Sequence, residues 1–255
     1  MKLGIAAVAA VLCLGGCTWL EPPIEESDIA GAALGPGEEL LRSVPGEGAP
    51  AYRFTIGGGG ACARADGVFD GAAEAFRMTI SMDGPQPGSS VTMGLVLLGE
   101  DAWIRIGLEP AEVARQLGLP DGWVAFDPER VESFRIGGTG GGSDPAGAGD
   151  LLENAVGVTR AGNRKYSGTL DLTKAEDPMM LTTEQITALG DAARSVPFTA
   201  SVDAEGRLTT LTTQVPGGTC RIAFADYGKA VTPAAPATKD RSDEGEEKIY
   251  EILNS

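Results

Sequence analysis

Four cysteines, at positions 13, 17, 62 and 220, are the residues of this sequence best suited to covalent or metal chemistry. The chain contains no histidine, so it lacks the commonest general base and the commonest zinc ligand. Histidine-dependent catalytic triads, zinc-protease motifs and haem ligation by histidine are therefore excluded. Cys13 and Cys17 stand four residues apart in an apolar leader. This pair raises three possibilities: a metal site, a redox pair, or a modification that leaves no thiol.

The sequence around this pair favours the third possibility. Lys2 is followed by an uncharged run, residues 3–14, which is typical of a secretory signal and too short to span a membrane. The quartet Leu14-Gly15-Gly16-Cys17 resembles the bacterial lipobox, in which the cysteine thiol is acylated and becomes the first residue of the mature chain. We predict that residues 1–16 are a lipoprotein signal peptide and that Cys17 carries lipid. The alternative is an ordinary signal peptide that leaves Cys17 free.

Lipid on Cys17 would hold the protein at a membrane surface without embedding it. Each buried methylene of an acyl chain contributes about 0.8 kcal/mol, so one chain binds marginally while two or three chains, such as palmitate, hold firmly. Residues 17–45 are interpreted as the lipidated cysteine and a polar tether, with a short helix expected near its end. We expect a lipid-anchored protein on the outer face of the cell membrane.

The charge of the chain limits its partners. The formal net charge is −16, which repels nucleic acid and anionic lipid headgroups, so we expect no nucleic-acid partner. An apolar content of 42% is sufficient for the core of one domain, and the low aromatic content of 5% means that this core is mostly aliphatic.

Cys62 and Cys220 are the remaining cysteines. An even pair in an exported chain is most simply a disulfide, because the exterior of the membrane is oxidising. The alternative is two separate buried thiols. Neither cysteine belongs to a Cys-x-x-Cys motif, which argues against redox activity.

No other segment carries a recognisable catalytic or cofactor motif. The acidic pairs, such as Glu100-Asp101, fall in expected turns or in polar terminal segments and are interpreted as solvated. The glycine clusters at 57–60 and 137–142 lack the Gly-Lys-Ser/Thr ending of a phosphate loop, so they are interpreted as flexible loops. We therefore predict no catalytic residue, no metal and no cofactor.

Alternating apolar residues predict antiparallel strands, beginning at Tyr52. Residues 76–82 alternate in the same way, and residues 91–107 form a hairpin that turns at Gly99-Glu100-Asp101. The first arm of this hairpin, residues 91–98, is apolar on both faces, so we expect both of its faces to be covered.

Short helices are expected between these strands. Helical start and stop signals occur at 110–118, at 144–156 behind Asp144, and at 182–189, where Thr182 and Gln185 have the spacing of a capping box. The expected fold class is α+β, with a domain at 46–236. Residues 237–255 are interpreted as a mobile, charged tail whose segment EEKIYEILN could become helical on contact with a partner.

Several segments, taken in order, resemble one protein family. They are GEDAWIRIG with GWVAFD, then SDPAGAGDLLENAVGVTRAGNRKYSGTLDL, then VPFTASVDAEGRLTTL and FADYGKAVTPAAP. Together with the lipobox, they are similar to the actinobacterial LppX/LprG-type lipoproteins, which are related in fold to the LolA carrier. Tyr166-Ser167-Gly168 departs from the expected pattern, because a valine is expected before the glycine.

The resemblance implies a strongly curved antiparallel sheet, a half-barrel, with helices over its concave face and an apolar cavity between them. It also implies binding of lipid or glycolipid acyl chains, carriage in the cell envelope, and an envelope transporter as a possible partner. The residues expected to contact an acyl chain are Phe76, Met78, Ile80, Met93, Leu95, Leu97, Leu152, Val156, Ile186 and Leu189.

Two other functions stay open on the sequence alone. One is an anchored interaction module with a filled core that works through its acidic surface or its tail. The other is a hydrolase with an unrecognised site. A co-purified lipid would distinguish the carrier from both.

Overall fold

The computed structural model describes residues 34–46, 48–59, 62–84, 86–131, 144–175, 181–216, 218–242 and 245–254. The predicted signal peptide, the predicted lipidation site Cys17 and most of the predicted tether lie outside these residues.

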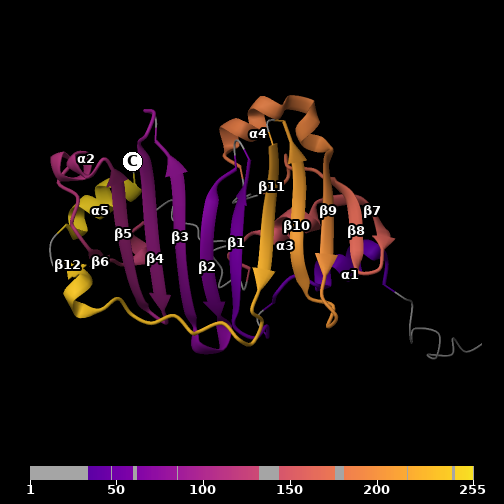
Figure 1. Cartoon of the computed structure of the whole chain (residues 1–255), viewed down its shortest axis with the longest axis horizontal. Coiled ribbons are helices and arrows are strands. Elements are labelled where there is room, and N and C mark those ends of the chain that lie inside the picture. The colour runs from indigo at the N-terminus through magenta and orange to yellow at the C-terminus, as the bar shows by residue number, and fades with distance from the viewer. Residues whose placement is uncertain are drawn as a thin grey trace, which may run out of the picture. The chain divides into compact units, whose positions relative to one another are not determined.

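The strands form one open sheet of twelve, in the order β12-β6-β5-β4-β3-β2-β1-β11-β10-β9-β8-β7 (Figure 1). Every pairing is antiparallel except that of β12 with β6. The strands are β1 Tyr52–Gly58, β2 Arg64–Asp70, β3 Ala75–Asp83, β4 Ser90–Leu98, β5 Asp101–Glu109, β6 Trp123–Ala125, β7 Ala155–Gly162, β8 Lys165–Leu170, β9 Val196–Val202, β10 Leu208–Val215, β11 Gly218–Ala225 and β12 Arg241–Ser242. The sheet is not closed into a barrel, and the α+β class is confirmed.

The helices are short. They are α1 Pro36–Arg42, α2 Ala111–Gln116, α3 Ala148–Glu153, α4 Thr183–Leu189 and α5 Glu246–Leu253, with 3₁₀ turns at η2 Gly71–Ala73, η3 Pro128–Arg130, η4 Gly190–Arg194 and η5 Thr238–Asp240. The predicted capping box of α4 is confirmed. The Gln185 backbone N–H donates to Thr182 Oγ1, and the Thr182 N–H donates to the Gln185 side chain.

Strand β4 has both faces covered, as its sequence predicts. It pairs with β5 through the Gly99-Glu100 turn, where Leu98 lies opposite Asp101. Leu95 on one face is 1% exposed and belongs to the main core, while Val96 on the other face is fully buried beside Trp103 and Trp123. We call the face of the sheet that carries the main core the inner face, and the opposite face the outer face.

The first helix belongs to the folded domain rather than to the tether. Leu40 of α1 is 1% exposed and lies in the main core, and the compact unit begins at Leu34. The domain boundary predicted at residue 46 is therefore about twelve residues too late. The apolar pair Leu40-Leu41 binds this segment to the domain despite its charged neighbours.

The prediction of a mobile tail is wrong. Residues 241–242 add the parallel strand β12 to β6, and residues 246–253 form α5. Ile249 is fully buried and Tyr250 is 6% exposed, both within the main core. The helix forms on this chain's own sheet, where the apolar side of an amphipathic segment removes its side chains from water.

The helix predicted at 144–156 is shorter than expected. It spans only Ala148–Glu153, and Val156 lies in strand β7 with 59% of its surface exposed. The assignment of Val156 to a buried helical stripe is therefore wrong, because the chain turns into a strand directly after Asn154. Asp144 still serves the helix start, since its carboxylate accepts from the Gly149 N–H at 2.6 Å.

The predicted disulfide between Cys62 and Cys220 is present. Their Cα atoms are 5.7 Å apart, and Cys220 is fully buried in β11. The bond joins the loop between β1 and β2 to the strand on the other side of β1, so it connects the early and late parts of the sheet.

Candidate lipid-binding face

Six of the predicted lipid-contacting residues are direct neighbours on two strands. In the β3–β4 register Phe76 lies opposite Leu97, Met78 opposite Leu95, and Ile80 opposite Met93. Paired residues on one face of an antiparallel sheet have Cβ atoms about 5 Å apart, so these side chains form one continuous apolar patch. Phe76, Met78 and Leu95 are buried, while Ile80, Met93 and Leu97 are partly buried against the core.

The apolar face extends well beyond β3 and β4. One cross-strand row runs from β10 to β5 and consists of Leu211, Ile222, Ile56, Ala65, Ile80, Met93 and Ile106. The next row runs from β11 to β6 and consists of Phe224, Phe54, Gly67, Met78, Leu95, Ile104 and Val124. The inner face is therefore apolar across most of the sheet.

A glycine within this face makes room for an aromatic ring. A Cβ built on Gly67 would lie 2.4 Å from Phe54, so the Phe54 ring lies across this position. The same ring stacks on Phe76 with centroids 6.2 Å apart and an angle of 3° between the planes. Any larger residue at 67 would displace this stacked pair.

Three of the four predicted helical contacts join the same core. Leu152 of α3 is buried, and Ile186 and Leu189 of α4 pack against the core while partly exposed. Val156 is the exception, since it projects from β7 toward solvent. Leu40 of α1 and Ile249 of α5 join this core as well and were not among the predicted contacts, although both lie in amphipathic segments whose periodicity indicates a buried side.

One hydroxyl in the core has no partner. Thr213 of β10 is fully buried, and within the described part of the chain its Oγ1 makes no hydrogen bond. Its cross-strand neighbours are Phe198 and the disulfide-bonded Cys220. A buried hydroxyl without a partner costs about 1–3 kcal/mol, so it marks a place where a polar atom would be accommodated favourably.

Three ionisable side chains, Tyr52, Tyr227 and Asp144, lie near the end of β1 that is remote from Thr213. Tyr52 is fully buried, and its ring lies 5.6 Å from that of Tyr227 and 5.7 Å from that of Phe224. The Tyr227 hydroxyl donates to the Leu208 carbonyl at 2.7 Å. Burial raises the pKa of the nearby Asp144 to about 6, although backbone N–H donors such as that of Gly149 act to lower it.

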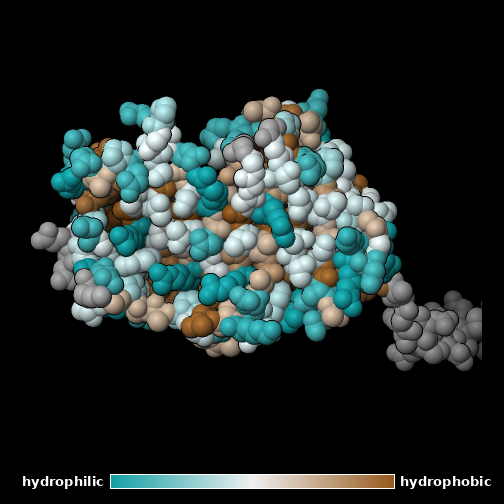
Figure 2. Space-filling model, viewed as in Figure 1, coloured by the Kyte–Doolittle hydropathy of each residue, from teal (hydrophilic) through white to brown (hydrophobic). Residues whose placement is uncertain are grey.

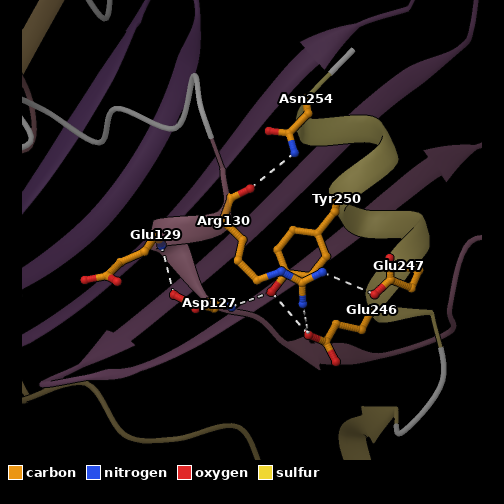
Figure 3. A network of polar contacts seen from close by, with 7 residues as sticks. All are labelled: Asp127, Glu129, Arg130, Glu246, Glu247, Tyr250 and Asn254. Carbon is orange, nitrogen blue, oxygen red and sulfur yellow. Dashed lines mark hydrogen bonds and ion pairs between the residues drawn. The ribbon is translucent and has the colours of Figure 1, made fainter.

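The C-terminal helix is held over the sheet by a polar network, which we call the α5 clasp (Figure 3). The Asp127 N–H donates to the Tyr250 hydroxyl at 2.8 Å, and this hydroxyl donates to Glu246 at 3.2 Å. The Arg130 guanidinium lies 3.8 Å from the centre of the Tyr250 ring and forms ion pairs with Glu246 and Glu247. The clasp fixes the helix whose Ile249 fills part of the inner face.

A separate hollow lies at the turn between β3 and β4. It is open, has a volume of about 550 Å³ and is lined by residues 83, 84 and 86–90. None of the ten predicted lipid-contacting residues lines it. Within the described ranges no helix is both long and apolar enough to cross a membrane, and no three metal-ligating side chains form a cluster.

Comparisons with known proteins return structures of bacterial lipoproteins. The crystal structure of LprF from Mycobacterium bovis has 15% sequence identity and a TM-score of 0.46, and the match covers 79% of this chain and 97% of that chain. The crystal structure of LppX from Mycobacterium tuberculosis has 13% identity and a TM-score of 0.39, with 77% and 93% covered. No family model and no curated protein matches this sequence. Both structures are what this chain is similar to, at low sequence identity.

Proposed function

We propose that this protein is a membrane-anchored lipoprotein that binds lipid acyl chains between the inner face of its sheet and the helices that cover it. It would carry these lipids in the cell envelope, and it would not be an enzyme. The observation that carries the proposal is the apolar inner face, which extends across most of the sheet and is covered by helices of only six to eight residues.

Short helices are a weak cover for such a face. A helix of fewer than about twelve residues has little stability of its own, so each cover helix is held mainly by its contacts with the sheet. Separation of a helix from the sheet would expose apolar surface worth about 25 cal/mol per Å², which an alkyl chain would cover again. Met78 and Met93 lie in this face, and their flexible side chains adapt to guests of irregular shape.

Thr213 supports a ligand with a polar group as well as an alkyl chain. Its hydroxyl is buried without a partner beside apolar neighbours. A hydrogen bond to an ester or hydroxyl oxygen of a bound lipid would remove the free-energy cost of this unpaired group. We therefore propose a lipid that has both an acyl chain and a polar oxygen, and an envelope transporter as the partner of the protein.

The test is native mass spectrometry of the chain produced without its first sixteen residues. We expect a co-purified lipid on the wild type and none on Leu95→Trp, because Trp would fill the space that the alkyl chain takes. The matched control is Thr55→Trp, which adds the same ring to an exposed position on the outer face of β1. This control should keep its lipid.

A filled core is the second candidate, in which the protein is an anchored interaction module without a lipid. The burial of Ile249 and Tyr250 within the inner-face core favours it, because α5 already covers part of that face. In that case no lipid would be found on the wild type. Leu95→Trp would then lower the free energy of unfolding by about 1–3 kcal/mol through overpacking.

A further inference from the structure

The outer face of the sheet carries basic residues in an otherwise acidic chain. Arg53, Arg77, Arg105 and Arg221 project from within four strands, and all four are exposed. In the described strands β1 to β5 and β11, the one acidic residue that projects from a strand interior onto this face is Asp66 of β2. The chain as a whole has 20 basic and 36 acidic residues. Basic residues therefore predominate in the strand interiors of this face, whereas acidic residues predominate in the chain as a whole.

The other charged residues of the outer face lie at strand ends. The acidic ones are Asp70, Asp83, Asp101 and Glu109. Asp83 pairs with Arg64, and Asp226 pairs with Arg53 at 3.3 Å. Within the described ranges no carboxylate lies within ion-pair distance of Arg77, Arg105 or Arg221. These three arginines therefore keep their charge available for a partner.

Two arginines on this face are combined with tryptophan. Arg77 lies over the Trp123 ring at 5.6 Å from its centre, and Arg241 lies over the Trp103 ring at 5.1 Å. The Trp123 ring in turn lies over Gly94, where a Cβ would be only 2.8 Å from it. Both rings are nearly buried, at 7% and 8% exposure, so the two guanidinium groups and not the rings face a partner. A guanidinium fixed in this way is placed to meet a lipid phosphate.

The shape of this face also suits a broad partner. It is the exposed side of an open sheet, and its visible surface is mostly pale or hydrophilic, with long hydrophilic side chains spread over many strands (Figure 2). Rows of hydroxyls such as Thr159, Ser167, Thr199 and Thr212 lie side by side across β7 to β10. Such a surface offers many separate hydrogen-bond donors rather than one pocket.

We propose that the outer face of the sheet docks on anionic phospholipid headgroups of the membrane. The net negative charge of the chain does not prevent this, because charges are screened over about 8 Å at physiological salt. The cover helices are about 10 Å across, so acidic residues on their far side lie beyond this distance from the membrane. The nearby arginines would then outweigh the distant carboxylates.

The attraction is modest, and it orients the domain rather than anchoring it. Each arginine near an anionic membrane strengthens binding by roughly fivefold. A lipid tether would add a high effective concentration at the surface, so that this attraction selects one orientation. The tether belongs to the proposed function, whereas the charge pattern does not depend on it. The experiment therefore uses a chain without lipid.

The test is flotation of the chain from residue 17 onward, with Cys17→Ser, on vesicles. We expect binding to phosphatidylglycerol vesicles at low salt, little binding to phosphatidylcholine vesicles, and loss of binding at high salt. The triple variant Arg77→Gln, Arg105→Gln, Arg221→Gln should weaken binding by about a hundredfold. The control Arg42→Gln, Arg115→Gln, Arg194→Gln removes the same charge from exposed helical positions and should have little effect.

Tryptophan fluorescence identifies the face that binds. With Trp19→Phe, the remaining tryptophans are Trp103 and Trp123, both nearly buried beneath arginines of the outer face, so docking of this face on the vesicle should shift their emission. Equal loss of binding in both triple variants, equal binding to both kinds of vesicle, or binding without this shift in emission would each overturn the proposal. None of these results would affect the acyl-chain proposal, which depends on co-purified lipid.

Discussion

At the scale of single residues, Asp144 links the folded state to pH. Asp144 as a whole residue is only partly buried. Its carboxylate accepts hydrogen bonds from backbone N–H groups at the start of α3 and lies close to Tyr52. Burial raises its pKa from 3.8 to about 6. The folded chain therefore binds a proton more tightly than the unfolded chain between about pH 4 and pH 6.

The pKa difference of Asp144 between the folded and unfolded chain fixes how stability changes with pH. A raised carboxyl pKa stabilises the fold fully below the unfolded value, and the contribution is lost as the pH rises to about 6. The loss amounts to at most about 3 kcal/mol. We expect Asp144→Asn to remove it, so that the variant gains about 2–3 kcal/mol relative to wild type between pH 4 and pH 7 in urea unfolding.

Asp203 provides a control of opposite sign. Burial acts to raise its pKa, but hydrogen bonds from Arg207 outweigh this effect and hold the pKa below its usual value. Asp203→Asn should therefore lose stability relative to wild type as the pH rises through the acid range. Parallel curves for wild type and Asp144→Asn would show that Asp144 ionises alike in both states.

At the scale of elements, α5 is the segment whose position depends most on a few contacts. Its buried side chains are Ile249 and Tyr250, and the α5 clasp provides its polar contacts. The ion pairs of Arg130 are about half exposed and add little stability. The hydroxyl of Tyr250 is different, because it satisfies the backbone N–H of Asp127.

We expect Tyr250→Phe to lower the free energy of unfolding by about 1–2 kcal/mol, since it leaves this N–H without its partner. Lys248→Ala on the same helix removes only a surface pair with Glu251 and should cost less than about 0.5 kcal/mol. Hydrogen exchange should also become faster in α5 of the Tyr250 variant. Equal costs for the two variants would mean that the clasp does not hold the helix.

At the scale of the whole molecule, a lipid at Cys17 would determine where the protein resides. Cys17 lies outside the described residues, and its acylation remains a prediction from the lipobox-like quartet. We expect labelled palmitate to be incorporated into the wild type, which should fractionate with membranes. Cys17→Ser should be unlabelled and should appear in the medium.

The double variant Cys62→Ala, Cys220→Ala is the control for this experiment. It removes the disulfide and keeps the site of lipidation, so it should still carry label and remain with the membrane. Absence of label on the wild type would exclude the anchor and leave a secreted protein.

The sequence by itself determined the elements whose evidence is local. Alternation along the chain identified β3 and β4, and the two-sided apolar pattern of residues 91–98 predicted a strand covered on both faces. The pairing of Cys62 with Cys220 followed from the even number of cysteines left in a chain that we expect to be exported. Each of these inferences depends on neighbours a few residues apart or on chemistry that does not require the fold.

Only the tertiary structure decided which distant segments share a surface. The tail contains an amphipathic stretch, but its position over the inner face depends on Asp127 and Arg130, more than a hundred residues earlier. The arginines of the outer face are likewise spread from residue 53 to residue 221 and meet only through strand order. Local periodicity specifies which side of a strand is apolar. Strand pairing and docking depend on contacts between segments far apart in the chain, and therefore only the fold reveals them.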